Sequence, residues 1–145
     1  MFLPLAVVIL LSDQLSKALV RACMVSGTST AVLPNIFHLT LVENRGIAFG
    51  LFQGFDPVLF SVITVSIFLL MIWGFRTPPA QVRIQGGIGL VLGGALGNWI
   101  DRVRLGAVVD FLDFRIWPVF NLADTAITIG VGLFLLDLLR KRRAA

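Results

Sequence analysis

Long apolar runs alternate with shorter polar segments along this chain, and the pattern predicts four helices. The runs cover about residues 2–22, 57–75, 84–100 and 121–139. Each approaches the roughly 20 residues that a helix needs to cross a hydrocarbon core of about 30 Å. Because a backbone in lipid must satisfy its hydrogen bonds within the segment, each run is expected to be helical. The 145 residues therefore suit a single integral-membrane domain.

The segment between the first two runs, about residues 23–56, has a different pattern. IFHLTLVE alternates apolar and polar residues, which predicts a strand, and Gly46 and Gly50 follow it at positions that permit turns. The expected fold is an all-α membrane protein with four transmembrane helices and a small extracytoplasmic β-sheet from this first outer loop. In the third run, GGIGLVLGGALGN carries small residues at helical spacing, which predicts close helix packing.

Composition and charge support the membrane class and suggest a topology. The chain is 57% hydrophobic and 14% charged, whereas soluble domains carry about 25% charged residues. The net charge is +4, but RKRR at 140–143 lies at one end, which favours a topology signal over a nucleic-acid-binding face. Together with Arg76 and Arg83, this run predicts that both termini are cytoplasmic and that the first loop and the loop at 101–120 face outward.

Cysteine and histidine are too scarce for several kinds of site. With one cysteine, Cys23, and one histidine, His38, the chain can form neither an intramolecular disulfide nor a Cys/His metal cage. We expect Cys23 to be a small packing residue.

Several polar residues lie in or beside the apolar runs, where an aspartate at a helix centre costs roughly 2.5 to 3.5 kcal/mol. Asp13 and Lys17 are four residues apart, so they share a helix face and are expected to pair and tie the first helix to its neighbours. Asn98, Asp101 and Arg102 lie within one turn at the end of the third run. Asp101 suits a structural role, whereas Arg102 suits either the scaffold or a site that holds a carbonyl or carboxylate.

Two further aspartates suggest chemistry. Asp110 lies in a short extended piece, and Asp124 lies near the outward start of the fourth helix, where it suits helix capping as well as a site. If the two carboxylates lie close together, they share a proton, so one can act as a base on water and the other as an acid. This arrangement hydrolyses a peptide bond without a covalent intermediate. Ser16 and Lys17 are a poor nucleophile–base pair because adjacent helical residues point about 100° apart.

Five sequence blocks in order resemble those of the bacterial lipoprotein signal peptidases, also called signal peptidase II. They are DQLSK at 13–17, ENRGIAFG at 43–50, GGALGNWIDR at 93–102, VVDF at 108–111 and FNLADTAITIG at 120–130. Any one block is weakly specific, but the five together span most of the chain.

The resemblance implies a four-helix aspartic protease whose catalytic pair is Asp110 and Asp124. It implies site-shaping roles for Asn44, Gly46, Asn98, Arg102 and Asn121, and structural support from Asp13, Lys17 and Asp101. Such an enzyme cleaves diacylated prolipoproteins just before the lipidated cysteine, needs no metal or cofactor, and is inhibited by globomycin. The expected location is the bacterial inner membrane, with both termini cytoplasmic and the active site at the periplasmic side. Nothing in the sequence requires more than a monomer, with membrane lipid as its surroundings.

Two other classes of function stay open on the residues alone. A small transporter or channel would spread its acids across the membrane depth. An assembly factor would use them only to pack helices. Asp56 and Asp113 are expected to be ordinary loop acids. Five of the eight acids fall around outer loops and helix ends, which favours the peptidase: Asp56, Asp101, Asp110, Asp113 and Asp124.

Overall fold

The computed structural model describes residues 2–45 and 82–144, which form three helices and three strands. The elements in chain order are α1 (Phe2–Cys23), β1 (Ser29–Leu33), β2 (Phe37–Asn44), α3 (Val82–Leu105), β3 (Val108–Asp113) and α4 (Leu122–Ala144). The helix predicted at 57–75 and the predicted site residue Gly46 lie outside the described residues.

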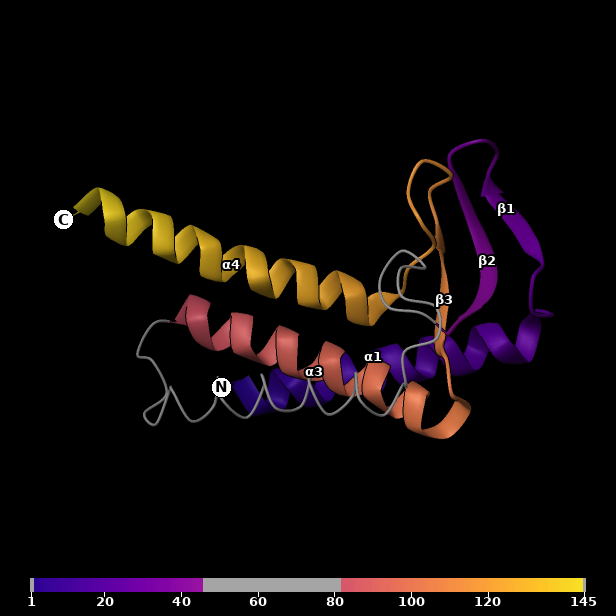
Figure 1. Cartoon of the computed structure of the whole chain (residues 1–145), viewed down its shortest axis with the longest axis horizontal. Coiled ribbons are helices and arrows are strands. Elements are labelled where there is room, and N and C mark those ends of the chain that lie inside the picture. Colours follow the sequence, from indigo (N-terminus) through magenta and orange to yellow (C-terminus); the bar gives the residue numbers. More distant parts are fainter. Residues whose placement is uncertain (1, 46–81, 145) are drawn as a thin grey trace.

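The helices lie side by side, and the strands run across one end of them (Figure 1). α1 begins and α4 ends at the end of the bundle away from the sheet. α3 is longer than the run predicted at 84–100 and continues to Leu105, so Arg102 lies in its last turn rather than in an outer loop. It ends where Gly106 takes a φ of 69° and its N–H donates to the Arg102 carbonyl, an ending that favours glycine.

Glycines on α3 let the neighbouring helices approach its backbone, as the small-residue pattern predicts. A Cβ on Gly93 would lie 2.5 Å from the Ala6 carbonyl oxygen of α1. A Cβ on Gly94 would lie 2.5 Å from the Ala123 carbonyl oxygen of α4. These distances are too short for a side chain, so the two adjacent glycines let α1 and α4 pack closely on two different sides of α3.

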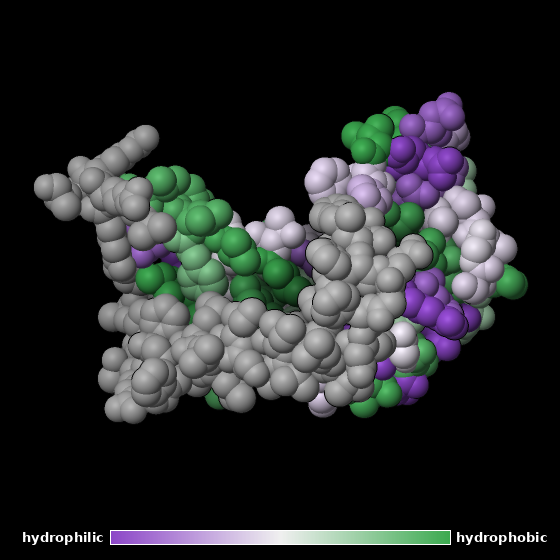
Figure 2. All heavy atoms as spheres, viewed as in Figure 1, coloured by the Kyte–Doolittle hydropathy of each residue, from purple (hydrophilic) through white to green (hydrophobic). Residues whose placement is uncertain are grey.

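α1 exposes apolar side chains and buries charged ones, the reverse of the usual pattern in a soluble protein. Large apolar side chains recur every fourth residue on an exposed face of α1, whereas Asp13 and Lys17 of the same helix are 0% and 2% exposed. The exposed residues are Leu3, Val7, Leu11, Leu15 and Leu19. In Figure 2 apolar surface gathers over the helices and hydrophilic surface at the sheet end. In the described part of the chain, α1 has the length and apolar composition that a membrane crossing needs.

The sheet is antiparallel, with the order β1-β2-β3. The sequence predicted a sheet from the first outer loop alone, but the third strand comes from the segment after α3. Its pairing places Asp110 opposite Val42 of β2. The segment after α3 joins the sheet because the backbone N–H and C=O groups on that edge of β2 would otherwise be unpaired. The sheet thereby carries Asp110 to the end of the helix bundle.

Two minor predictions were wrong. Cys23 is exposed at the end of α1 instead of packed. Asp113, expected to be a loop acid, is a β3 residue only 5% exposed. The Thr40 hydroxyl donates to its Oδ2 at 2.7 Å and holds the pKa of Asp113 below its usual range. This hydrogen bond joins β2 to β3 beside the loop that leads to α4.

The glycine contacts predict the outcome of a matched pair of substitutions. Gly94→Ala forces a methyl group against the backbone of α4, and overpacking of this kind costs about 1 to 3 kcal/mol. Gly86→Ala on the same helix meets nothing within 4 Å. It should be neutral or stabilise the helix by up to about 1 kcal/mol. Thermal unfolding in detergent should give a lower midpoint for Gly94→Ala only, and equal midpoints for the two variants would contradict the packing of α3 on α4.

Candidate functional site

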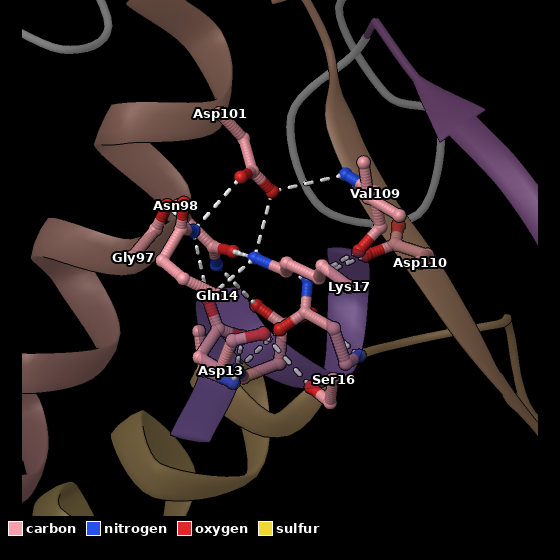
Figure 3. A network of polar contacts seen from close by, with 12 residues as sticks. Asp13, Gln14, Ser16, Lys17, Gly97, Asn98, Asp101, Val109 and Asp110 are labelled. Carbon is pink, nitrogen blue, oxygen red and sulfur yellow. Dashed lines mark hydrogen bonds and ion pairs between the residues drawn. The ribbon is translucent and has the colours of Figure 1, made fainter. Parts of the chain in front are cut away.

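A buried lysine lies at the centre of the polar interior. The Lys17 ammonium contacts Asp13 Oδ2 at 2.8 Å, Asp101 Oδ2 at 2.7 Å and Asn98 Oδ1 at 2.9 Å (Figure 3). An ammonium has three N–H donors, so all three are used. The Asp13–Lys17 pair that the spacing predicts is therefore present. Lys17 also bonds two residues of α3, which the sequence did not specify.

The two aspartates that hold Lys17 also bind backbone groups of other elements. Asp13 Oδ1 accepts from the N–H of Ala123 at 3.0 Å, in the first turn of α4. Asp101 Oδ2 accepts from the N–H of Val109 at 3.2 Å, in β3. Gln14 donates to Asp101 Oδ1 at 2.9 Å and to the carbonyl of Gly97 at 3.1 Å. These bonds fix α1, α3, β3 and the start of α4 against one another.

The first turn of α4 is a reciprocal cap formed by Asn121 and Asp124. Asn121 Oδ1 accepts from the Asp124 N–H at 2.9 Å, and Asp124 Oδ2 accepts from the Asn121 N–H at 3.3 Å. This is the geometry of a capping box, with asparagine and aspartate in the two roles. The capping role that the sequence left open for Asp124 is thus present. Its other oxygen, Oδ1, accepts from Asn98 Nδ2 at 2.8 Å and is directed toward α3.

Asp110 is 3% exposed and is held by two amides. Asn121 Nδ2 donates to its Oδ1 at 2.7 Å, and Asn44 Nδ2 donates to its Oδ2 at 3.0 Å. Burial raises the pKa of Asp110 to about 7, the charge of Asp124 adds to the rise, and the two amides limit it. A carboxyl group of this kind can give up or take a proton near neutral pH.

One residue therefore joins the two aspartates. Asn121 contacts Asp110 through its side chain and Asp124 through its backbone and side chain. Its Nδ2 also donates to Asn98 Oδ1 at 3.1 Å. The Arg102 guanidinium donates to the Asn98 carbonyl at 3.4 Å, and its charge interacts with those of Asp124, Asp110 and Asp101. A water molecule beside this pair of carboxylates would meet a base and an acid together.

The structure joins the predicted residues through two connected sets of polar contacts, except Gly46, which is not described. One set contains the residues predicted to be catalytic or site-shaping, which are Asn44, Asn98, Arg102, Asp110, Asn121 and Asp124. The other set contains the residues predicted to give structural support, which are Asp13, Lys17 and Asp101. Asn98 belongs to both sets because its amide accepts from Lys17 and donates to Asp124.

Sequence reasoning did not assign a site role to Gln14 or Thr40. Gln14 is adjacent in sequence to Asp13 and bonds Asp101, so its place beside the aspartates was the available signal. Thr40 lies in the alternating strand pattern, where a polar residue is ordinarily a solvent-facing position. Its partner Asp113 is 73 residues away, and only the strand pairing brings them together.

No metal site is evident in the parts of the chain that the structure describes. Residues 2–45 and 82–144 contain no group of three or more histidine, cysteine, aspartate or glutamate side chains that could hold a metal ion. The aspartates of the site are instead bonded to amides, backbone N–H groups and the Lys17 ammonium.

Comparison with known proteins gives one consistent result. A sequence model of the family described as signal peptidase (SPase) II matches residues 5–140. The lipoprotein signal peptidase of Halothermothrix orenii is 46% identical over 137 residues, covering 94% of this chain and 93% of the relative. That of Pelotomaculum thermopropionicum is 52% identical, covering 87% and 83%. A solved structure of a bacterial membrane enzyme is 37% identical with a TM-score of 0.89, covering 97% of this chain and 88% of that one.

The environment of Asp110 predicts the pH at which its carboxyl group loses its proton, and infrared spectroscopy can measure this without an activity assay. The infrared C=O band of its protonated carboxyl should be present at acidic pH and disappear as the pH rises through about 7. The Asp110→Asn variant should lack this band. Glu43→Gln, which changes an exposed carboxyl of the adjacent strand β2, should retain it. A band that titrates as in an exposed aspartate would show that Asp110 is not held as described.

Proposed function

The chain belongs to the signal peptidase II family, and from that premise we propose that it is an aspartic endopeptidase acting on diacylated prolipoproteins. It removes their signal peptides by cutting just before the lipidated cysteine. The single observation that carries the aspartic mechanism is the pair of bonds from Asn121, which hold Asp110 and Asp124 around one residue.

Asp124 is the base of the pair. Its carboxylate lies in the first turn of α4, where the positive end of the helix dipole stabilises negative charge. Both of its oxygens accept hydrogen bonds, one from Asn98 and one from the Asn121 N–H. A carboxylate held in a fixed position in this way can take a proton from a bound water.

Asp110 is the acid of the pair. It is buried on β3, and its pKa of about 7 keeps it largely protonated below that pH. A carboxyl group that keeps its proton near neutral pH is suited to act as the acid in proton transfer. This assignment gives Asp110 the proton of the resting enzyme.

The reaction then follows in two balanced steps. Asp124 takes a proton from water, the resulting hydroxide attacks the scissile carbonyl carbon, and Asp110 gives its proton to the carbonyl oxygen. The product is a neutral geminal diol, with Asp124 protonated and Asp110 ionised. In the second step Asp124 protonates the leaving nitrogen, the C–N bond breaks, and a diol hydroxyl returns its proton to Asp110. Arg102 and the amides of Asn44, Asn98 and Asn121 hold these groups and the substrate in position.

The enzyme works as a monomer in the bacterial inner membrane, with four transmembrane helices. Both termini are cytoplasmic and the sheet is periplasmic, because the basic residues at 140–143 lie at the C-terminal end of α4 and the sheet stands at the opposite end of the bundle (Figure 1). The exposed apolar faces of α1 and α4 contact lipid, and the diacylglycerol of the substrate lies along them. The scissile bond then lies at the depth of Asp110 and Asp124.

The outer sheet offers a second contact for the substrate. β1 is an edge strand, and all five of its residues are exposed. An extended peptide can add to such an edge through backbone hydrogen bonds. This contact orients the precursor while its lipid is held by the helices.

Substitution of either aspartate tests the proposal directly. Asp110→Asn and Asp124→Asn should each reduce cleavage of a diacylated prolipoprotein by about 10²- to 10⁴-fold, because each removes one partner in proton transfer. Both variants should remain folded, since asparagine retains the size of aspartate and one of its acceptor oxygens, and thermal unfolding checks this.

Glu43→Gln is the matched control and should cleave at the wild-type rate, because it removes an exposed carboxyl next to Asn44. Globomycin should inhibit the wild-type activity, which excludes a contaminating protease. Wild-type turnover by a folded Asp110→Asn or Asp124→Asn variant would remove that residue from the catalytic pair.

The assignment of Asp110 as the acid also predicts the pH dependence. The active enzyme needs a protonated Asp110, so kcat/KM should fall on the alkaline side of a pKa of about 7. The fall should approach tenfold per pH unit, because a single proton is lost. A profile that is flat through this range, or that rises with pH, would show that Asp110 does not act in its protonated form.

A further inference from the structure

We propose that Lys17 is a positioning residue for the two aspartates: its ammonium holds the Asn98 amide in the orientation that donates to Asp124. This inference rests on the proposed function, since it assigns a role in the proposed chemistry to a buried ammonium whose bonds go to Asp13, Asp101 and Asn98. Its basis is a chain of hydrogen bonds in which each amide has one possible orientation.

The first link is Asn121. Its Oδ1 must be the acceptor that faces the N–H of Asp124, because a backbone N–H can only donate. Its Nδ2 must therefore face the other side, where it contacts Asp110 Oδ1, Asn98 Oδ1 and the carbonyl of Val109. All three of those atoms are acceptors.

The second link is Asn98. Its Oδ1 faces two donors, Lys17 Nζ at 2.9 Å and Asn121 Nδ2 at 3.1 Å. A reversed amide would direct its N–H groups at the ammonium and place oxygen against the carboxylate of Asp124. The charged donor thus fixes which end of Asn98 meets Asp124 Oδ1 at 2.8 Å. A charge-assisted bond in a buried site restricts this rotation more strongly than a neutral one.

Lys17 has a second effect through its charge. In the described residues, the charged groups around the two aspartates are Lys17 and Asp13 from α1, and Asp101 and Arg102 from α3. Asp13 and Asp101 hold the ammonium, and Arg102 interacts with both aspartates of the proposed pair. The charge of Lys17 lowers the pKa of Asp110, against the larger effect of burial. Removal of Lys17 should therefore raise the pH at which Asp110 loses its proton.

A test must limit the instability that unpaired buried charges cause. Lys17→Met alone would leave both Asp13 and Asp101 without their cation, so we pair it with Asp101→Asn, which keeps the net charge of the site. The remaining carboxylate, Asp13, still accepts from the Ala123 N–H and from Gln14. Asp101→Asn alone is the reference, and the exposed Arg21→Met on α1 controls for loss of a positive charge. Thermal unfolding identifies the folded variants, and kcat, KM and pH profiles are measured with a diacylated prolipoprotein.

Relative to Asp101→Asn, the Lys17→Met/Asp101→Asn variant should show a kcat lower by about 10- to 100-fold, because small misplacements of catalytic groups have effects of this size. KM should change little. The alkaline limb of the pH profile should move to higher pH, by up to about one unit. Lys17→Gln/Asp101→Asn restores a neutral donor to Asn98, so it should recover part of kcat while its alkaline limb stays shifted.

A folded double variant with the kcat and pH profile of Asp101→Asn would overturn the proposal. Loss of the fold in both double variants would also overturn it and leave Lys17 a structural role alone. These outcomes differ from failure of the proposed function, which would appear as full cleavage by Asp124→Asn. An active wild type, an inactive Asp124→Asn and an unshifted Lys17 variant together would reject only the role of Lys17.

Discussion

The structure depends on one buried cation, the ammonium of Lys17. Two carboxylates and one amide surround it, and they come from α1 and α3. Breaking a buried ion pair by removal of one partner typically costs about 3 to 5 kcal/mol, because a charge is left without compensation. Asp13 and Asp101 also bind backbone N–H groups of α4 and β3. A single charged cluster therefore positions α3, β3 and the start of α4, which carry Asn98, Asp110 and Asp124.

At the start of α4, single residues likewise have both a structural role and a role in the site. Asn121 caps the helix and at the same time donates to Asp110, so the bond that begins α4 also sets the separation of the two aspartates. Asp124 accepts a capping bond with one oxygen and directs the other at Asn98. The same hydrogen bonds thus cap α4 and position the two aspartates. The helix-capping role that the sequence suggested for Asp124 is therefore compatible with the proposed role in catalysis.

Much of this was predictable from local pattern. Hydrophobic run lengths predicted the helices at both ends of the chain, alternation predicted β2, and small residues predicted the close packing of α3. The i,i+4 spacing predicted the pair of Asp13 and Lys17. The predictions that failed concern which segments lie around a residue. Cys23 is exposed and Asp113 is buried, and the third strand of the sheet, β3, comes from a segment distant in sequence. Burial depends on what other segments cover a residue, which its own neighbours in sequence do not specify.

The sequence by itself determined the membrane class, the family resemblance and the residues to consider, because periodicity and block order are properties of adjacent residues. Tertiary structure alone decided which of those residues meet. It placed Asn98 between Lys17 and Asp124, and it joined Asp110 to Asn121 across the gap between β3 and α4. Hydrogen bonds act over about 3 Å. The orientation of the Asn98 and Asn121 amides and the raised pKa of Asp110 therefore arise only after packing has brought separate helices and strands within that distance.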